Sequence, residues 1–472
     1  MIFSIDQKPE NAPALCAEDG TVVTYGKLSG QIGQVADAVP KRVLIFCMCR
    51  NTPESVIGYL AFVSGKAVPL LLDAGLSADA LKRLRTVYRP PYFWLPKEML
   101  SAVPDAEPVL EQRNYVLAKT GDPVCPLASE LALLLPTSGS TGSPKLVRLS
   151  RKNLEANAES ISCYLRLTAA ERPITTLPMQ YSYGLSILNS HLLRGACILL
   201  TQFSVVQQQF WNFLREQRAT SFGGVPFTYE LLRRLHFTDH VFPSLHSMTQ
   251  AGGKLPVALQ REFGVWARKN GVRFYVMYGQ TEATARMSYL APEKCLEKCG
   301  SVGMAIPGGR FSLRGGDGST VEEPEQIGEL LYEGDNVTLG YAECAADLAK
   351  GDERKGVLET GDMARRDSEG YYYIAGRKKR FVKMQGIRVS LDECEQLLLN
   401  RFRDFSFACV GRDDRITVFT TDAHSSGAAA DYLASALRLH PSVVRERFLP
   451  EIPKNDAGKT LYAVLRKEAE EV

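Results

Sequence analysis

The strongest constraint on the fold is an alternation of short apolar runs with helical patterns along most of the chain. Apolar runs of strand length occur at 42–49, 130–139, 196–200 and 272–279. Helical patterns lie between them, for example at 154–165 and 210–216. Continuous apolar runs are typical of strands buried on both faces, and strands that alternate with helices build parallel sheets. We therefore predict an α/β fold with mixed, largely parallel sheets flanked by helices.

The pattern changes after about residue 300. Residues 301–375 are rich in glycine and in short β-prone runs, which predicts a small antiparallel β unit. Ser390 and Glu393 then have the spacing of a capping box that opens a helix. We predict a large domain over 1–378 and a small α+β domain over 379–472.

Composition excludes several classes of protein. A net charge of +3 over 472 residues gives no reason to expect nucleic acid or an anionic membrane as a partner. The best apolar run, Val56 to Gly65, is too short to span a bilayer, and the N-terminus lacks the pattern of a signal peptide. Among the 11 cysteines only Cys295 and Cys299 hint at a metal site, without a matching Cys/His pair nearby. We expect reduced, mostly buried thiols in a cytoplasmic protein.

One loop carries a clear chemical signal. Pro136 to Lys145 (PTSGSTGSPK) follows an apolar run, places hydroxyls between glycines, and ends in a lysine. Glycines permit a close backbone approach to a polyanion, while amides, hydroxyls and an ammonium donate to its oxygens. A Walker A loop is excluded because Pro144 precedes the lysine, and the Gly-Lys-Thr at 458–460 lacks the first glycine. Taken alone, a loop of this kind is more often a solvated Ser/Gly loop than an anion site.

Six motifs in a fixed order resolve that ambiguity. They are VVTYGKLS (22–29), GKAVPLLLD (65–73), the loop PTSGSTGSPK, MYGQTEA (277–283), the block 358–389 that runs from Thr-Gly-Asp to Gly-x-Arg, and PKNDAGKTLYAVL (453–465). In this order they resemble the ANL superfamily of adenylate-forming enzymes. Its members are acyl- and aryl-CoA synthetases, adenylation domains of peptide synthetases, and firefly-type luciferases. The resemblance covers almost the whole chain.

The resemblance implies a binding site for ATP and Mg²⁺. The loop residues Thr137, Ser138, Gly139, Ser140, Thr141, Gly142 and Lys145 would hold the β- and γ-phosphates. Thr281 would contact the α-phosphate, and Glu282 would bind Mg²⁺, a hard cation suited to carboxylate and phosphate oxygens. The remaining nucleotide-binding residues would be Ala251, Gly252, Gly253, Tyr278 (on adenine), Gly279, Gln280, Asp362 (on the ribose), Arg377 and Lys383.

The same resemblance assigns the catalytic and hinge residues. Lys459 matches the catalytic lysine that bridges the substrate carboxylate and the α-phosphate, with Thr281 and Lys145 as further catalytic groups. Lys379 occupies the pivot on which the small domain would rotate, although it could also be one more charge in a solvated basic run. Gly386 would then line the tunnel for a thiol. The acceptor would be CoA or the phosphopantetheine of an acyl or peptidyl carrier protein, and an amine stays possible.

The acyl pocket is predicted less directly. By resemblance it draws on Tyr181, Ser182, Leu185, Gly224, Val225, Met277 and Met287, which could equally belong to the core. Tyr181 stands where CoA ligases often have a histidine. Ser182 stands where amino-acid-activating domains commonly carry an aspartate, which counts against an α-amino acid substrate.

We therefore predict an AMP-forming acid–thiol ligase that acts on a small carboxylic acid through an acyl-adenylate. One alternative is a stand-alone amino-acid-adenylating or amide-forming ligase. Another is a degenerate member of the superfamily that binds a nucleotide or acyl ligand without catalysis. The presence of Thr281, Glu282, Asp362 and Lys459 disfavours this last alternative.

Overall fold

The structure is a computed structural model that describes residues 1–136, 145–384, 387–412, 414–437, 439–454 and 460–470. The chain forms two compact units. The first contains Met1–Arg310 and Tyr332–Leu358, and the second contains Phe311–Leu331 and Glu359–Val472. The boundary predicted between residues 378 and 379 falls inside the second unit. Since that boundary concerns a hinge between moving domains, it stays a prediction.

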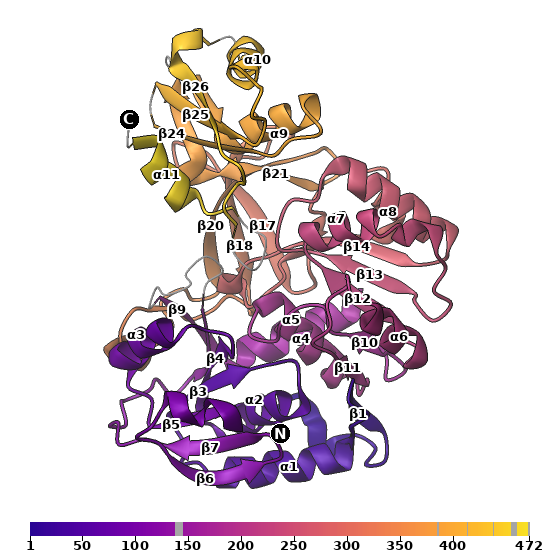
Figure 1. Cartoon of the computed structure of the whole chain (residues 1–472), viewed down its shortest axis with the longest axis vertical. Helices are drawn as coiled ribbons and strands as arrows, with labels where there is room; N and C mark the ends of the chain where they lie inside the picture. The colour runs from indigo at the N-terminus through magenta and orange to yellow at the C-terminus, as the bar shows by residue number, and fades with distance from the viewer. Residues whose placement is uncertain (137–144, 385–386, 413, 438, 455–459, 471–472) are drawn as a thin grey trace. The chain divides into compact units, whose positions relative to one another are not determined.

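A nine-stranded sheet in the first unit carries the predicted nucleotide motif at the end of β14 (Figure 1). Its order is β16-β15-β14-β13-β12-β10-β11-β1-β2, and the six strands from β14 to β1 run parallel. The strands are β1 (Pro13–Ala17), β2 (Val22–Thr24), β10 (Pro173–Ile174), β11 (Ile198–Leu200), β12 (Ser221–Gly224), β13 (Ser247–Gln250), β14 (Arg273–Tyr278), β15 (Ser288–Leu290) and β16 (Met304–Ala305).

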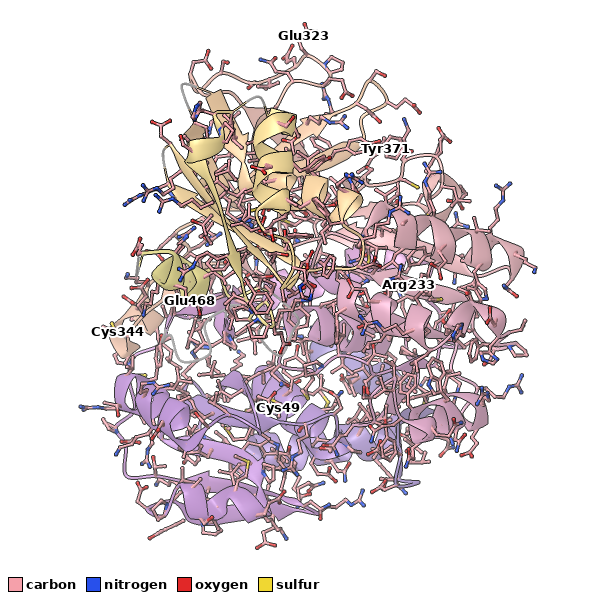
Figure 2. The ribbon with its side chains drawn as sticks, turned by 45° about the horizontal axis from the view of Figure 1, so that its top comes forward. Cys49, Arg233, Glu323, Cys344, Tyr371 and Glu468 are labelled. Atoms are coloured by element: carbon pink, nitrogen blue, oxygen red, sulfur yellow. The ribbon has the colours of Figure 1, made fainter. Side chains whose placement is uncertain are left out.

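An eight-stranded sheet completes the frame of this unit. Its order is β19-β9-β8-β4-β3-β5-β7-β6, with β8, β4, β3 and β5 parallel. The side chains of β3 are all buried, as expected for a central strand covered on both faces. Figure 2 labels Cys49, the last residue of this strand. The strands are β3 (Leu44–Cys49), β4 (Val68–Asp73), β5 (Tyr92–Pro96), β6 (Glu107–Gln112), β7 (Tyr115–Lys119), β8 (Leu131–Pro136), β9 (Leu146–Ser150) and β19 (Gly340–Ala342).

Helices cover both sheets (Figure 1). One core cluster joins residues of α1, α2, α4 and α5 to strands of both sheets, which confirms the predicted α/β architecture of mixed sheets flanked by helices. Within the described ranges, no helix is both long enough and apolar enough to cross a bilayer. The helices of the unit are α1 (Tyr25–Asp37), α2 (Pro53–Gly65), α3 (Ala78–Tyr88), α4 (Arg151–Tyr164), α5 (Ser182–Leu193), α6 (Gln208–Glu216), α7 (Pro226–Arg234) and α8 (Val257–Lys269).

The second unit is α+β. A four-stranded sheet of order β17-β18-β20-β21 lies mostly within it, and smaller sheets pair β22 with β23 and join β24, β25 and β26. Ser390 caps α9 by accepting a hydrogen bond from the Glu393 amide at 3.3 Å. The elements are β17 (Gly309–Arg314), β18 (Gly328–Gly334), β20 (Val357–Arg366), β21 (Tyr372–Arg377), β22 (Phe381–Met384), β23 (Ile387–Ser390), α9 (Leu391–Arg401), β24 (Phe407–Arg412), β25 (Arg415–Thr420), α10 (Ala428–Leu437), β26 (Val444–Phe448) and α11 (Tyr462–Glu470).

The stretch 301–375 is less uniform than its sequence predicts. Four of its strands form the small sheet, but β16 pairs antiparallel with β15 and β19 pairs antiparallel with β9. Both outliers extend sheets of the first unit. Glycine-rich β-prone sequence predicts that strands form, but their pairing partners are set by tertiary contacts.

Candidate active site

The chain makes a tight return directly after β14, and Gly279 permits it. A Cβ at Gly279 would lie 1.8 Å from the carbonyl oxygen of Ala285, so only glycine fits there. The Asn336 side-chain amide holds the returning segment by donating to the carbonyls of Ala283 at 2.9 Å and Arg286 at 3.2 Å. This return fixes the short helical turn Thr281–Ala283 at the end of the strand.

Thr281 and Glu282, the predicted phosphate and Mg²⁺ residues, lie on this turn. The Thr281 hydroxyl is buried and lies 3.1 Å from the Ser182 hydroxyl at the start of α5. The carbonyl of Glu282 accepts hydrogen bonds from the amide and the hydroxyl of Thr338, at 3.1 and 2.9 Å. Both residues are thus held by their backbone or a neighbouring hydroxyl.

Tyr341 links Glu282 to Lys145. The Tyr341 hydroxyl donates to Glu282 Oε1 at 2.7 Å, and the Lys145 ammonium lies 3.9 Å from the centre of the Tyr341 ring. Burial, with a smaller contribution from the negative charge of Glu282, raises the pKa of Tyr341 to about 12, so the phenol stays protonated and can donate. Lys145 also lies 3.8 Å from the Glu343 carboxylate.

Sequence reasoning did not identify Tyr341. It lies on β19, about 60 residues after the motif it supports, and no local pattern marks it. Only the antiparallel pairing of β19 with β9, which places Tyr341 opposite Val147, brings it near the segment that begins with Lys145. The structure therefore brings together the predicted residues Lys145, Ser182, Thr281 and Glu282 and adds Tyr341 to them.

Glycines at the ends of β12 and β13 allow close packing in the region of the predicted acyl pocket. A Cβ at Gly252, where φ is +84°, would lie 2.5 Å from the Tyr181 hydroxyl. A Cβ at Gly253 would lie 3.0 Å from Pro226, and one at Gly224 would lie 3.0 Å from Thr228. These glycines let the ends of β12 and β13 lie close to Tyr181 and to the first residues of α7.

Four predicted residues share one apolar cluster of the first unit. Tyr181, Val225, Ala251 and Met277 belong to it together with the aromatic side chains of α4, α5, β14 and β15. Leu185 packs in the larger core cluster between the sheets, and its amide donates to the Tyr181 carbonyl at 2.9 Å. Met287 is fully buried, and its amide donates to the Tyr278 carbonyl at 2.9 Å.

The remaining predicted adenine-binding residues lie at the end of β14. Tyr278 is half-buried, and the Gln280 side-chain amide donates to its hydroxyl at 3.3 Å. The Tyr278 hydroxyl is therefore held by Gln280, while part of the residue stays exposed.

Asp362 and Arg377, the predicted ribose-binding residues, contact each other in the second unit. They lie opposite one another on the antiparallel strands β20 and β21. The Arg377 Nε is 2.8 Å from Asp362 Oδ1, and the carboxylate is almost fully buried while the arginine is exposed. The Asp362 amide also donates to the Thr360 hydroxyl at 3.0 Å. The carboxylate is thus fixed at the strand pair.

Several predicted residues lie outside the described residues. They are Thr137, Ser138, Gly139, Ser140, Thr141, Gly142, Gly386 and Lys459. For Lys379 and Lys383 the structure describes the backbone but not the side chain. Their roles stay predictions.

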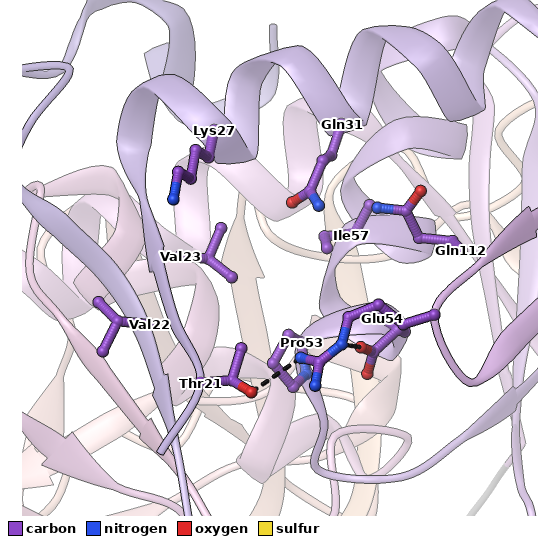
Figure 3. Close-up of a pocket in the computed structure, with 10 residues that line it drawn as sticks. Thr21, Val22, Val23, Lys27, Gln31, Pro53, Glu54, Ile57 and Gln112 are labelled. Carbon is purple, nitrogen blue, oxygen red and sulfur yellow. Dashed lines mark hydrogen bonds and ion pairs between the residues drawn. The ribbon is translucent and has the colours of Figure 1, made fainter. Parts of the chain in front are cut away.

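A separate pocket of about 270 Å³ in the first unit contains none of the predicted residues (Figure 3). Its lining includes buried Glu54, whose Oε1 lies 3.6 Å from the Arg113 Nε, and Thr21, which accepts a hydrogen bond from Arg113 at 2.8 Å. The Arg113 contacts bridge the end of the β1–β2 hairpin to the start of α2.

Comparison with known proteins identifies the family. The model of the AMP-binding enzyme family matches residues 4–342. The chain is 30% identical to the indoleacetate–CoA ligase of Aromatoleum aromaticum, over 69% of this chain and 65% of that protein. It is 28% identical to the oxalate–CoA ligase of Arabidopsis thaliana, over 74% and 71%.

Solved structures share the fold over the full length. The O-succinylbenzoate–CoA synthetase of Bacillus subtilis in complex with AMP matches with a TM-score of 0.79 and 23% identity, covering 100% of this chain and 98% of that chain. The ATP-bound MatB of Rhodopseudomonas palustris matches with a TM-score of 0.81 and 22% identity, covering 100% and 99%. The chain therefore belongs to the AMP-binding enzyme family, within the adenylate-forming superfamily that its six motifs resemble.

Proposed function

We propose that this chain is an AMP-forming ligase that activates a small carboxylic acid with ATP and transfers the acyl group to a thiol. The observation that carries the proposal is the cluster at the end of β14. There Thr281 contacts Ser182, and Glu282 is joined through Tyr341 to Lys145. Two hydroxyls, a carboxylate and a cation beside an apolar cluster suit an acyl phosphate anhydride. The CoA-ligase activity of the curated relatives supports the same assignment.

The first half-reaction joins two anions, so its transition state needs positive charge and hydrogen-bond donors. A carboxylate oxygen of the acid attacks the α-phosphorus of ATP, the bond to the bridging oxygen breaks, and pyrophosphate leaves. Lys145 would neutralise the leaving pyrophosphate with the loop 137–142, and the Thr281 hydroxyl would donate to the α-phosphate. Lys459 would bridge the attacking carboxylate and the α-phosphate.

Glu282 fits a Mg²⁺ ion that accompanies ATP. Glu282 is half-buried, and the Tyr341 hydroxyl orients its Oε1 through a hydrogen bond. Carboxylates that bind metal ions are commonly oriented by such a hydrogen bond from a neighbouring group. No group of three or more metal-ligating side chains occurs in the described part of the chain. One carboxylate completed by phosphate oxygens and water is typical of Mg²⁺ sites in nucleotide enzymes. When bound, the ion would supply charge neutralisation on the phosphates.

The second half-reaction forms the thioester. A thiol, of CoA or of a carrier-protein phosphopantetheine, attacks the acyl carbon, and AMP leaves with the electrons of the broken bond. Rotation of residues 379–472 about Lys379 would exchange Lys459 for the segment that contains Gly386. All 11 cysteines are free thiols, which suits a cytoplasmic enzyme.

Isotope exchange between pyrophosphate and ATP, measured over a panel of carboxylic acids, tests the first half-reaction. Mass detection of acyl-CoA and acylated carrier protein then tests the second. We expect exchange that depends on one acid class. Lys459→Ala should reduce exchange at least 100-fold with little change in ATP binding, and near-parental exchange would contradict its assignment. Exchange with no carboxylate in the panel would refute the proposed function.

A further inference from the structure

Arg286 is a buried cation with no anionic partner among the residues that the structure describes. It lies shortly after the turn Thr281–Ala283, and only 2% of its surface is exposed. Among residues the structure describes, no carboxylate lies within 4 Å of its guanidinium, and its Nε has no hydrogen-bond partner. An uncompensated buried charge is costly, on the order of several kcal/mol. Such a cost at this position calls for a ligand that balances the charge.

The guanidinium contacts Met277, one of the residues predicted to form the acyl pocket, and two tyrosines. Its Nη1 is 3.4 Å from the Met277 sulfur and donates to the Tyr164 hydroxyl at 3.2 Å. Its central carbon lies 5.0 Å from the centre of the Tyr183 ring. Met277, Tyr164 and Tyr183 all belong to the apolar cluster that contains Tyr181, Val225 and Ala251. The charge is therefore next to the predicted acyl-binding side chains.

The neighbouring polar groups do not balance this charge. His191 lies one helical turn beyond Ile187 and two beyond Tyr183 on α5, and its Nε2 finds no hydrogen-bond partner in the described part of the chain. Burial, with a smaller contribution from the positive charge of Arg286, lowers the pKa of His191 to about 4, so its ring is neutral. The Asn157 side-chain amide donates to the Arg286 carbonyl at 3.0 Å, and its Oδ1 has no partner among the described residues.

A buried water molecule could hydrogen-bond these atoms, but it would leave the guanidinium charge unbalanced. An anionic group would accept a hydrogen bond from the Arg286 Nε and balance the charge, while the Asn157 Oδ1, itself an acceptor, would still need a donor such as water. The unpartnered Nε–H is one arm of the planar fork with which a guanidinium holds a carboxylate or a sulfonate. The face of the Tyr183 ring supports the cation without neutralising it.

We propose that Arg286 binds a second anionic group of the acyl substrate, so that the acid activated by this chain is a dianion. One carboxylate reacts with ATP, and a second carboxylate or a sulfonate at the far end of the same molecule pairs with Arg286. This inference rests on the proposed function and specifies its substrate class.

The test compares acids that differ only in the second charge. The pairs are pentanoate with glutarate, benzoate with isophthalate, and propanoate with 3-sulfopropanoate, assayed by isotope exchange between pyrophosphate and ATP. We expect kcat/KM of the parent to favour the dianion at least tenfold in one pair. In Arg286→Met this ratio should fall below one, because the second charge would then be buried unpaired, while the KM for ATP stays within twofold. Arg286→Lys should retain part of the preference because it keeps the charge.

Arg273→Met is the matched control. Arg273 is a partly buried arginine at the start of β14, and it donates to the Leu165 carbonyl at 3.0 Å. This variant should keep the parental ratio. A parent that prefers the monoanion in every pair, or an Arg286→Met variant that keeps the parental ratio, would overturn the inference while the proposed function stands. If Arg286→Met does not fold, the ratio of kcat/KM between dianion and monoanion in the parent still tests the inference. Exchange with no acid would instead refute the proposed function on which the inference rests.

Discussion

Two buried arginines, one in each unit, lie in opposite electrostatic surroundings. Arg380, in the second unit, is 6% exposed, and its guanidinium lies 2.5 Å from Asp392, 2.7 Å from Glu395 and 3.7 Å from the centre of the Tyr462 ring. Arg286, in the first unit, also lies over a tyrosine ring but has no carboxylate partner among the described residues. Burial is similar, so the difference lies in how the charge is compensated.

This difference indicates which arginine holds the fold together and which one serves a ligand. Arg380 and its two carboxylates form a closed set, in which Tyr462 also donates to Glu395 at 2.9 Å. Removal of one member of such a set leaves a buried charge unpaired. Arg286 already lacks a carboxylate partner within the described ranges. Its removal should cost stability little and change what the site binds.

The largest expected effect is the destabilisation of the second unit by Arg380→Met. The variant leaves Asp392 and Glu395 without their cation, at a cost of about 3–5 kcal/mol in the free energy of unfolding. The three tryptophans, Trp94, Trp211 and Trp266, all lie in the first unit. Urea unfolding followed by circular dichroism should therefore show an early transition that tryptophan fluorescence does not report.

Arg403→Met is the control for this prediction, because Arg403 is exposed in the same unit. Its effect should stay within about 0.5 kcal/mol. If Arg380→Met unfolds with the midpoint of the control, the ion-pair set does not stabilise the second unit.

A smaller effect is expected from His191, the neutral neighbour of the unpaired arginine. Its pKa is about 4 in the folded chain against an ordinary value of 6.5. Between these values the unfolded chain binds more protons, so stability falls as the pH is lowered from 6.5 to 4, by about 3 kcal/mol. His191→Leu should remove this part of the pH dependence. The pH dependence of the free energy of unfolding is measured by urea unfolding, followed by tryptophan fluorescence, at several pH values.

Arg286 contributes to the low pKa of His191 through its positive charge. Arg286→Met should therefore raise that pKa and reduce the loss of stability in acid. The same acid dependence in the parent and in His191→Leu would show that His191 is not titrating in this window.

The sequence predicts the frame of the molecule and the location of much of the site. Buried apolar runs such as the one that becomes β3 require sheets covered on both faces, and the motif after β14 places Thr281 and Glu282 together at the end of a strand. Gly279 is part of that motif, and the structure gives the steric reason for it. These features depend on local spacing, which a single sequence displays.

Features that depend on tertiary pairing could not be predicted in this way. Tyr341 reaches Glu282 only because β19 pairs with β9, and Leu185 turns toward the core because α5 presents a different face there. Arg286 gives no signal in the sequence, since an arginine among apolar residues is ordinarily expected at the surface. Its burial and its missing partner are visible only once Tyr164, Met277 and Tyr183 converge from three different elements.

The smallest expected change in stability belongs to Arg286→Met, and it completes the comparison with Arg380→Met. The substitution removes one hydrogen bond to Tyr164 and the contact with the Tyr183 ring, but it also removes an unpaired buried charge. Replacement of buried charges by apolar side chains of similar size is often neutral or stabilising. The free energy of unfolding, from urea titration followed by tryptophan fluorescence, should therefore fall by no more than about 1 kcal/mol. A loss as large as that expected for Arg380→Met would mean that Arg286 stabilises the fold. A small loss together with a lost preference for dianionic acids would assign its charge to the substrate.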